Sequence, residues 1–226
     1  MIQEKPPVNI LTIDVGGTNV KILATGQKIP LKIASGPTMT PRRMVSSVKK
    51  LAVHWNYEAV SIGYPGPVLH GHILQEPRNL APGWVEFDFT KAFGCPVKVI
   101  NDASMQALGC YKGRRMLFLG LGTGLGATMI VNGVMEPMEL GRFPYRGATY
   151  EDYVGIRGLK RYGKKKWRKY VADVVKRLSA ALASDDIVLG GGNAKSLKKL
   201  PKGCRRGDNS YAFIGGFRLW AKGERE

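Results

Sequence analysis

Three apolar runs in this chain each lead into a glycine-rich turn, and this repeated pattern constrains the fold more than any other feature. Because glycine lacks a Cβ atom, backbone N–H groups in such turns can approach an anion closely, and a threonine hydroxyl adds one more donor. No turn fits the P-loop pattern or the dinucleotide-binding G-x-G-x-x-G at the start of a helix. The sequence therefore predicts phosphate binding by another type of fold, at Gly16-Gly17-Thr18, Gly122-Thr123-Gly124 and Gly190-Gly191-Gly192.

The order of the expected elements predicts an α/β fold. Two series of hairpins, each followed by alternating strands and helices, are typical of mixed sheets arranged in two lobes. Asn132-Gly133 is the residue pair that favours a type I′ hairpin turn. Residue alternation, run length and helical spacing place strands at 8–14, 21–25, 28–33, 59–64, 97–100, 115–121, 127–131, 134–135 and 186–189, and helices at 41–55, 103–111 and 164–183.

The net charge of +18 is concentrated in one part of the chain. Residues 157–206 contain 16 lysines and arginines against three acidic residues. Such a field attracts polyanions, including nucleic acid, nucleotides, acidic membranes and inorganic polyphosphate. A solvated basic helix face is the plain alternative, and charge alone does not choose between these possibilities.

The rest of the composition indicates a cytoplasmic protein without a membrane segment. The N-terminus lacks the basic and apolar regions of a signal peptide, and no apolar run approaches the roughly 20 residues that span a bilayer. Three cysteines and three histidines, in no metal-ligand spacing, predict reduced thiols and no zinc site.

Two acidic residues at strand ends are candidates for chemistry. Asp14 stands two residues before the first glycine turn, where a carboxylate near phosphate requires an intervening cation such as Mg²⁺, and Lys21 can add positive charge there. Asp102 follows Asn101 at the end of another strand, where it can serve as a base for an attacking hydroxyl. The alternatives are a turn-capping role for Asp14 and a helix N-cap at 101–102. Asn101 can also cap the helix while Asp102 points inward.

Seven ordered segments resemble motifs of the ROK sugar kinases, within the hexokinase–actin–Hsp70 superfamily. They cover roughly residues 8–220. Ile13-Asp14-Val15-Gly16-Gly17-Thr18-Asn19-Val20-Lys21 resembles phosphate-1, and Leu121-Gly122-Thr123-Gly124-Leu125-Gly126 resembles phosphate-2. The others are Gly63-Tyr64-Pro65-Gly66-Pro67-Val68, Asn79-Leu80-Ala81-Pro82-Gly83-Trp84, Asn101-Asp102-Ala103, Glu139-Leu140-Gly141 and Gly190-Gly191-Gly192-Asn193.

The resemblance implies a two-lobed, actin-like (ribonuclease H-like) fold with mixed sheets and a cleft between lobes. We place the small lobe, with phosphate-1 and sugar-binding segments, at 1–103 and the large lobe, with phosphate-2 and the donor glycine loop, at 104–226. By position, Asp102 is the general base, and Asp14 organises Mg²⁺ through water. The implied sugar-binding set is Gly66, Asn79, Asn101, Asp102, Glu139 and Arg142; the phosphate set is Asp14, Gly16, Gly17, Thr18, Lys21, Gly122, Thr123 and Gly124; the nucleotide set is Gly190, Gly191, Gly192 and Asn193.

Departures from the family pattern bear on the substrates. Arg142 stands where the family's ExGH motif has histidine, so a permanent cation replaces a neutral imidazole and leaves the sugar open. The compact length, the missing zinc-binding cysteines and the basic C-terminal half look most like the polyphosphate glucokinase branch. There, the run at 164–169 is a candidate track for polyphosphate.

The resulting hypothesis is a glucokinase that uses polyphosphate, ATP or both and phosphorylates a hexose, with glucose 6-OH as the expected acceptor. The alternatives are an ATP-dependent kinase for another hexose or an N-acylhexosamine, and a sugar-sensing protein without catalysis. No specific nucleic acid or membrane partner is expected, and the family resemblance implies a homodimer. A repressor is disfavoured because the sheet begins at Val8, without a preceding helix-turn-helix.

Overall fold

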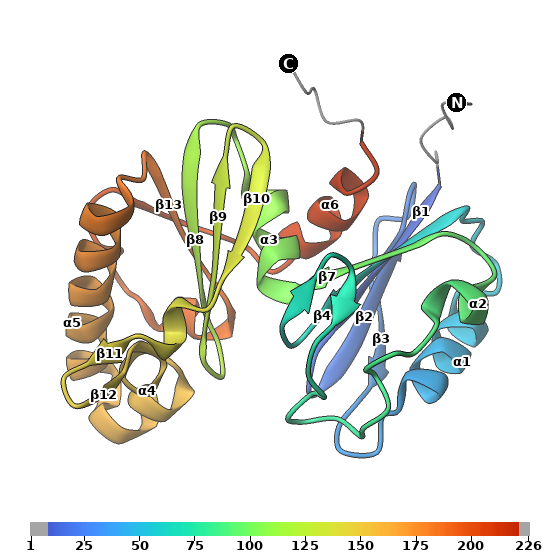
Figure 1. Ribbon diagram of the computed structural model, residues 1–226, viewed down its shortest axis with the longest axis horizontal. Coiled ribbons are helices and arrows are strands. Elements are labelled where there is room, and N and C mark those ends of the chain that lie inside the picture. The colour runs from blue at the N-terminus through green and yellow to red at the C-terminus, as the bar shows by residue number, and fades with distance from the viewer. Residues whose placement is uncertain (1–8, 222–226) are drawn as a thin grey trace. The chain divides into compact units, whose positions relative to one another are not determined.

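The computed structural model describes residues 9–221, which form two compact units (Figure 1). The first unit contains the described residues up to Met105 and those from Ala212 onward, and the second contains residues 106–211. The segment from Met1 to Pro7, where we expect no signal peptide, lies outside the described residues. None of the described helices combines the length and the apolar character needed to cross a membrane.

The first unit is built on a five-stranded mixed sheet with the strand order β3-β2-β1-β4-β7. The first three strands in the sequence pair antiparallel as a meander, and the last two extend the sheet with parallel pairing. The parallel strands therefore end at one edge of the sheet, and Asp14 and Asn101 lie near this edge. The strands are β1 (Ile10–Val15), β2 (Asn19–Ala24), β3 (Leu31–Ala34), β4 (Ala59–Tyr64) and β7 (Val97–Asn101).

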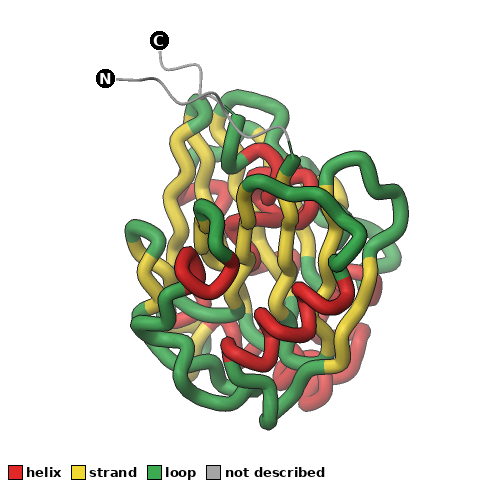
Figure 2. The backbone as a smooth tube through the Cα atoms, turned by 90° about the vertical axis from the view of Figure 1, so that its right-hand side faces the viewer, coloured by secondary structure: helices red, strands yellow, loops and turns green. Residues whose placement is uncertain are grey.

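Two helices and a loop cover one face of this sheet, and Figure 2 shows helical segments in front of the strands on this side. Helix α1 (Pro41–Leu51) begins where Thr40 Oγ1 accepts a hydrogen bond from Arg43 N at 3.2 Å. Trp84 is fully buried in the same core and donates from Nε1 to Ala81 O at 2.8 Å. The remaining elements on the loops of this unit are α2 (Phe89–Phe93), β5 (Val68–Leu69) and β6 (His72–Ile73).

The opposite face of the first sheet packs against the C-terminal helix α6 (Tyr211–Arg218). Ser61 Oγ donates to Gly216 O at 2.6 Å and accepts from Trp220 Nε1 at 2.9 Å. A Cβ atom on Gly216 would collide with the side chain of Thr12. We expected residues 104–226 to form one lobe; instead, the end of the chain returns to the first unit because this glycine permits contact with β1.

The second unit contains another five-stranded mixed sheet, with the order β10-β9-β8-β13-β14. Its first three strands in the sequence form an antiparallel meander, and two parallel strands follow. Each unit thus repeats the same plan of a meander extended by parallel strands. The strands are β8 (Arg115–Leu121), β9 (Leu125–Val131), β10 (Val134–Met138), β13 (Asp186–Gly190) and β14 (Cys204–Arg206).

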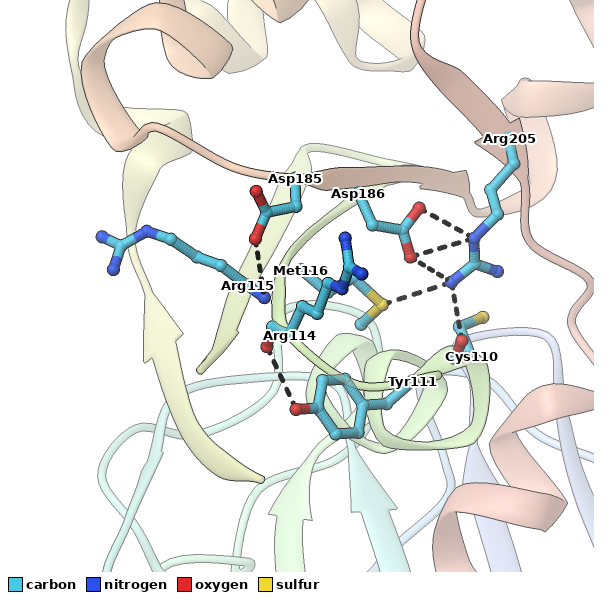
Figure 3. Close-up of polar contacts among 8 residues, drawn as sticks. All are labelled: Cys110, Tyr111, Arg114, Arg115, Met116, Asp185, Asp186 and Arg205. Carbon is cyan, nitrogen blue, oxygen red and sulfur yellow. Dashed lines mark hydrogen bonds and ion pairs between the residues drawn. The ribbon is translucent and has the colours of Figure 1, made fainter. Parts of the chain in front are cut away.

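Arg205 joins three elements of the second unit (Figure 3). Its Nη2 atom donates to Asp186 Oδ2 at 2.6 Å and to Cys110 O at 2.7 Å, while Nε lies 2.9 Å from Asp186 Oδ1. The carbonyl of Cys110 is at the end of helix α3 (Asp102–Cys110), where the last carbonyls of a helix need partners outside it. This bidentate pair therefore fixes the edge strand β14 to β13 and to the end of α3.

Helix α5 (Ile156–Leu182) supplies the apolar face that covers the second sheet. Its buried side includes Trp167, Val171, Val174, Val175 and Leu178, which repeat at helical spacing. The helix begins earlier than the expected residue 164 because two helical segments join at Gly163, which has φ 68°. The remaining elements are η1 (Leu140–Arg142), β11 (Pro144–Tyr145), β12 (Ala148–Thr149), α4 (Tyr150–Val154) and η2 (Gly192–Ser196).

Candidate active site

Asp14 lies near the end of β1, in a buried position next to Lys21 of the antiparallel neighbour β2. The two residues are register partners, and Lys21 Nζ is 3.2 Å from Asp14 Oδ2. Burial raises the pKa of the Asp14 carboxyl, and the charge and hydrogen bond of Lys21 act in the opposite direction. The hairpin register thus brings together the acid and the cation that we expected at one site.

The first glycine turn connects β1 to β2 in a fixed conformation. Gly16 N donates to Asn19 O at 3.1 Å, and Ser35 Oγ donates to Gly16 O at 2.6 Å. A Cβ atom on Gly17 would lie 3.1 Å from Asn79 Cβ, so Asn79 of the expected sugar-binding segment lies against this turn. Thr18 is exposed at the tip. The turn is therefore held from two sides, and its threonine remains accessible.

Asp102 lies in the same unit, at the start of α3 and immediately after β7. Burial, followed by the negative charge of Asp14, raises its pKa to about 7, while a backbone hydrogen bond from Ala103 N opposes this shift. Gly63 of β4 is the register partner of Asp14 on one side and of Ile100, two residues before Asp102, on the other. Its Cβ position is 3.5 Å from Asp102 Cα, so a side chain there would crowd the start of α3.

Asn101 caps the start of α3. Its Oδ1 atom accepts hydrogen bonds from Ala103 N at 2.9 Å and Ser104 N at 3.2 Å, and its Nδ2 atom donates to Gly66 O at 3.0 Å. This cap satisfies amide groups that the helix itself leaves without partners. It also ties the Asn101-Asp102 segment to the loop that follows β4, and thereby fixes the backbone at Asp102.

The phosphate-2 turn at 122–124 joins β8 to β9 in the second unit. Asn193 Nδ2 donates to Gly122 O at 2.7 Å, and Ile156 N lies 3.0 Å from the same carbonyl oxygen. The turn is therefore held by η2 on one side and by the start of α5 on the other. Thr123 is exposed, and its hydroxyl is available to a ligand.

The glycine run at 190–192 packs close to this turn. Gly191 has φ 80°, and its Cβ position lies 2.5 Å from Leu121 O, so both its conformation and its contacts require glycine. A Cβ atom on Gly190 would meet the Phe118 ring at 2.5 Å. Gly192 has open space at the corresponding position. The structure therefore places two of the three expected glycine turns side by side in the second unit.

The expected sugar-binding residues Glu139 and Arg142 flank the short helix η1. Arg142 Nε is 3.4 Å from Glu139 Oε2, and both side chains are more than half exposed. A Cβ atom on Gly141 would lie 2.8 Å from Leu125 O and 3.5 Å from Glu151 Cβ. The segment is thus anchored near the phosphate-2 turn, and an ion pair stands where the family pattern has glutamate and histidine.

The acids of the first unit have the chemistry required to hold Mg²⁺ with bound water. Asp14 and Asp102 lie close enough for the charge of one to raise the pKa of the other. A divalent cation relieves such repulsion, and Mg²⁺ takes one or two carboxylates together with water and phosphate oxygens. No group of three or more histidines, cysteines, aspartates or glutamates in the described part of the chain is arranged to hold a metal ion. None of the three cysteines forms a disulfide.

Several residues of these sites carry no recognisable sequence signal. Ser35 contacts the first turn from a distant part of the chain, and Gly63 makes room for α3. In the second unit, Glu151 and Gly155 pack against Gly124, and Arg157 forms an ion pair with Glu151. Only the packing of α4 and of the start of α5 against the turn at 122–124 reveals these contacts, because nothing in their local sequence marks them.

The fold resembles that of solved sugar kinases. An inorganic polyphosphate/ATP glucomannokinase from Arthrobacter aligns with a TM-score of 0.80 and 21% identity, covering 96% of this chain and 99% of that one. A ROK family glucokinase from Streptomyces griseus, solved with glucose and AMPPNP, aligns with a TM-score of 0.75 and 16% identity, covering 95% and 100%. The expected α/β class with mixed sheets is confirmed.

The chain belongs to the ROK family, whose model matches residues 10–138. Among curated relatives, a polyphosphate glucokinase of Mycobacterium tuberculosis is 26% identical over 209 residues, which cover 83% of this chain and 78% of the relative. The resemblance stated from the motifs is therefore confirmed, and these likenesses support a kinase of the hexokinase type.

Proposed function

We propose that this protein transfers a phosphoryl group from polyphosphate or ATP to a hexose hydroxyl, with glucose 6-OH as the expected acceptor. The observation that carries the proposal is the placement of Asp14, near the end of the strand that leads into the first glycine turn, within electrostatic reach of buried Asp102 at the start of α3. An acid with a pKa of about 7 can accept a proton at neutral pH and is well matched to general-base catalysis. A sugar kinase of this family requires such a group.

In the proposed reaction, Asp102 accepts the proton of the sugar hydroxyl as its oxygen forms a bond to the terminal phosphorus of the donor. The bond from that phosphorus to the donor's bridging oxygen breaks, and the shortened polyphosphate or ADP leaves. We assign one phosphate site to the turn at 16–18, where Lys21 supplies positive charge, and a second phosphate site to the turn at 122–124 of the other unit. Mg²⁺ held near Asp14 through water would neutralise the phosphate oxygens. Catalysis by positioning and charge stabilisation fits these rigid turns.

Polyphosphate is the preferred donor because of the exposed cations on α5. Lys164, Lys165, Lys166 and Lys169 are all exposed, whereas Trp167, which lies among them in the sequence, is buried. Arg168 is less available, because its Nε atom donates to Ser196 O at 2.8 Å. A row of solvated lysines is suited to a long flexible polyanion. The name of the mycobacterial relative agrees with this donor.

The acceptor is tested by a coupled assay that crosses glucose, mannose, fructose and N-acetylglucosamine with ATP and polyphosphate. We expect turnover with polyphosphate and glucose. The other sugars are included because Arg142, paired with Glu139, alters the group available to sugar hydroxyls. Turnover only with another sugar would reassign the acceptor. Tight sugar binding without turnover in any combination would instead favour a sensor.

The titration of Asp102 provides a second test that does not require turnover. Its carboxyl carbon, followed by NMR in the folded protein, should titrate with a midpoint near pH 7 because burial and the charge of Asp14 raise its pKa to about 7. In the Asp14→Asn variant, the like charge is absent, so the midpoint should move to lower pH. In the wild type, kcat/KM should decline as the pH falls below about 7. A midpoint near 4, the ordinary aspartate value, would contradict this environment.

A further inference from the structure

The start of α5 is built onto the phosphate-2 turn. Ile156 N lies 3.0 Å from Gly122 O and 3.2 Å from Thr123 O. A Cβ atom on Gly155 would lie 2.7 Å from Thr123 O and 3.1 Å from Gly124 Cα. The next residue along the chain, Arg157, is therefore held in the immediate neighbourhood of a turn that has the construction of a phosphate site.

Arg157 carries a cation that bridges two acids of α4. Its Nη2 atom is 2.9 Å from Asp152 Oδ1 and 3.3 Å from Glu151 Oε1. The arginine side chain is 63% exposed, whereas those of Glu151 and Asp152 are 23% and 32% exposed. The acids are thus largely enclosed by protein, and the guanidinium retains access to solvent and donors for further hydrogen bonds.

The two acids would oppose phosphate binding if they were not neutralised. The Glu151 carboxylate occupies the space beside Gly124, where a Cβ atom would collide with Oε2. Hydrogen bonds from Thr149, together with the nearby charge of Arg157, lower the pKa of Asp152, so this acid is ionised at neutral pH. A phosphate chain at this turn therefore meets fixed negative charge, and Arg157 is the cation in contact with both acids.

We propose that Arg157 is a donor-phosphate ligand of the turn at 122–124, and that its guanidinium contacts the phosphate chain directly while it remains anchored by Glu151 and Asp152. This inference rests on the proposed function and assigns a further binding residue to its donor site. Arginine suits this role because its planar fork presents five N–H donors, so it can pair with a carboxylate and a phosphate at the same time.

The test measures binding of tripolyphosphate to the full chain by titration calorimetry, without a sugar or turnover. We expect Arg157→Ala to weaken binding about tenfold or more and Arg157→Lys to weaken it less, since lysine keeps the charge but loses the fork. Arg177→Ala is the matched control. It also removes an exposed arginine of α5 that is paired with an aspartate, Asp173 at 3.3 Å, and should change the affinity less than twofold. Thermal unfolding of each variant reports on its folding.

A double variant separates direct contact from simple neutralisation of Glu151. If Arg157 contacts the phosphate chain, Arg157→Ala combined with Glu151→Gln should recover only part of the lost affinity. Full recovery to the wild-type affinity would overturn the proposed contact, as would equal effects of Arg157→Ala and Arg177→Ala. Failure of the wild type to bind tripolyphosphate would also overturn it. Normal binding by the wild type without phosphorylation of any sugar would instead reject the proposed function and leave the role of Arg157 supported.

Discussion

Replacing Asp102 with asparagine is expected to reduce kcat for the proposed phosphoryl transfer by about 10²- to 10⁴-fold, the range typical of a lost general base. The amide has nearly the shape of the carboxylate but cannot accept the hydroxyl proton at neutral pH. The Asp102 side chain accepts a hydrogen bond from Ala103 N at 2.7 Å, which an amide oxygen can also accept, and Asn101 keeps its bonds to Ser104 N and Gly66 O, so the start of α3 should persist. The measurement is single-turnover phosphorylation with the donor identified by the coupled assay.

The free energy of unfolding of Asp102→Asn tells whether the variant loses activity through the missing base or through a damaged fold. Because the native pKa of Asp102 is raised to about 7, the folded protein keeps a proton that the unfolded chain loses near pH 4. The contribution of Asp102 to the free energy of unfolding of the wild type therefore decreases as the pH rises from about 4 to about 7. Asparagine has no such penalty, so Asp102→Asn should unfold at the same or a higher denaturant concentration at pH 8. Retained turnover in a folded variant would remove Asp102 as the base.

Gly216→Ala should destabilise the protein by about 1–3 kcal/mol, the usual cost of overpacking a core. In the interior of an unconstrained helix, the same change stabilises by about 1 kcal/mol, so the sign itself is diagnostic. The added methyl would collide with the side chain of Thr12, whose buried Oγ1 has no hydrogen-bond partner among the described residues. The displaced helix would also strain the 2.6 Å bond from Ser61 Oγ to Gly216 O.

A double-mutant cycle with Thr12→Ala tests the contact that we hold responsible. Thr12→Ala removes Oγ1 and Cγ2, so the cost of Gly216→Ala should be smaller in this background than in the wild type. Equilibrium denaturation monitored by tryptophan fluorescence measures the cost of Gly216→Ala in both backgrounds, and one of the four tryptophans, Trp220, bonds Ser61 Oγ at 2.9 Å on the same face. A stabilising Gly216→Ala would show that α6 does not pack on β1 as described.

The strands that lead into the glycine turns were predictable because their signals are local. Residues 59–64 and 115–121 match β4 and β8 to the residue, since a buried run bounded by turn residues marks both of its ends. The segment at 28–33 appears instead as β3 at Leu31–Ala34, because only its last part pairs with β2. The short elements β11, β12 and α4 were not predicted, since each has too few residues for a periodic pattern.

Part of the candidate site was also predictable. Asp14 and Lys21 were assigned to one site, and the hairpin register makes them partners across two antiparallel strands. We expected Asn101 to cap the helix that begins at 102, and the structure agrees, because Asn101 accepts hydrogen bonds from the first amides of α3. The roles assigned to these residues in binding and transfer remain predictions.

The sequence by itself determined the family, the two mixed sheets and the positions of the glycine turns, because these follow from local patterns and from motifs in a fixed order. The tertiary structure alone decided that α6 returns to the first sheet through the contact of Gly216 with Thr12. It also decided that Arg157 lies beside the phosphate-2 turn, joined to Glu151 and Asp152. Such contacts depend on how elements that are distant in the sequence pack against one another. Packing also determines which side chains are buried, and burial raises the pKa of Asp102 to about 7.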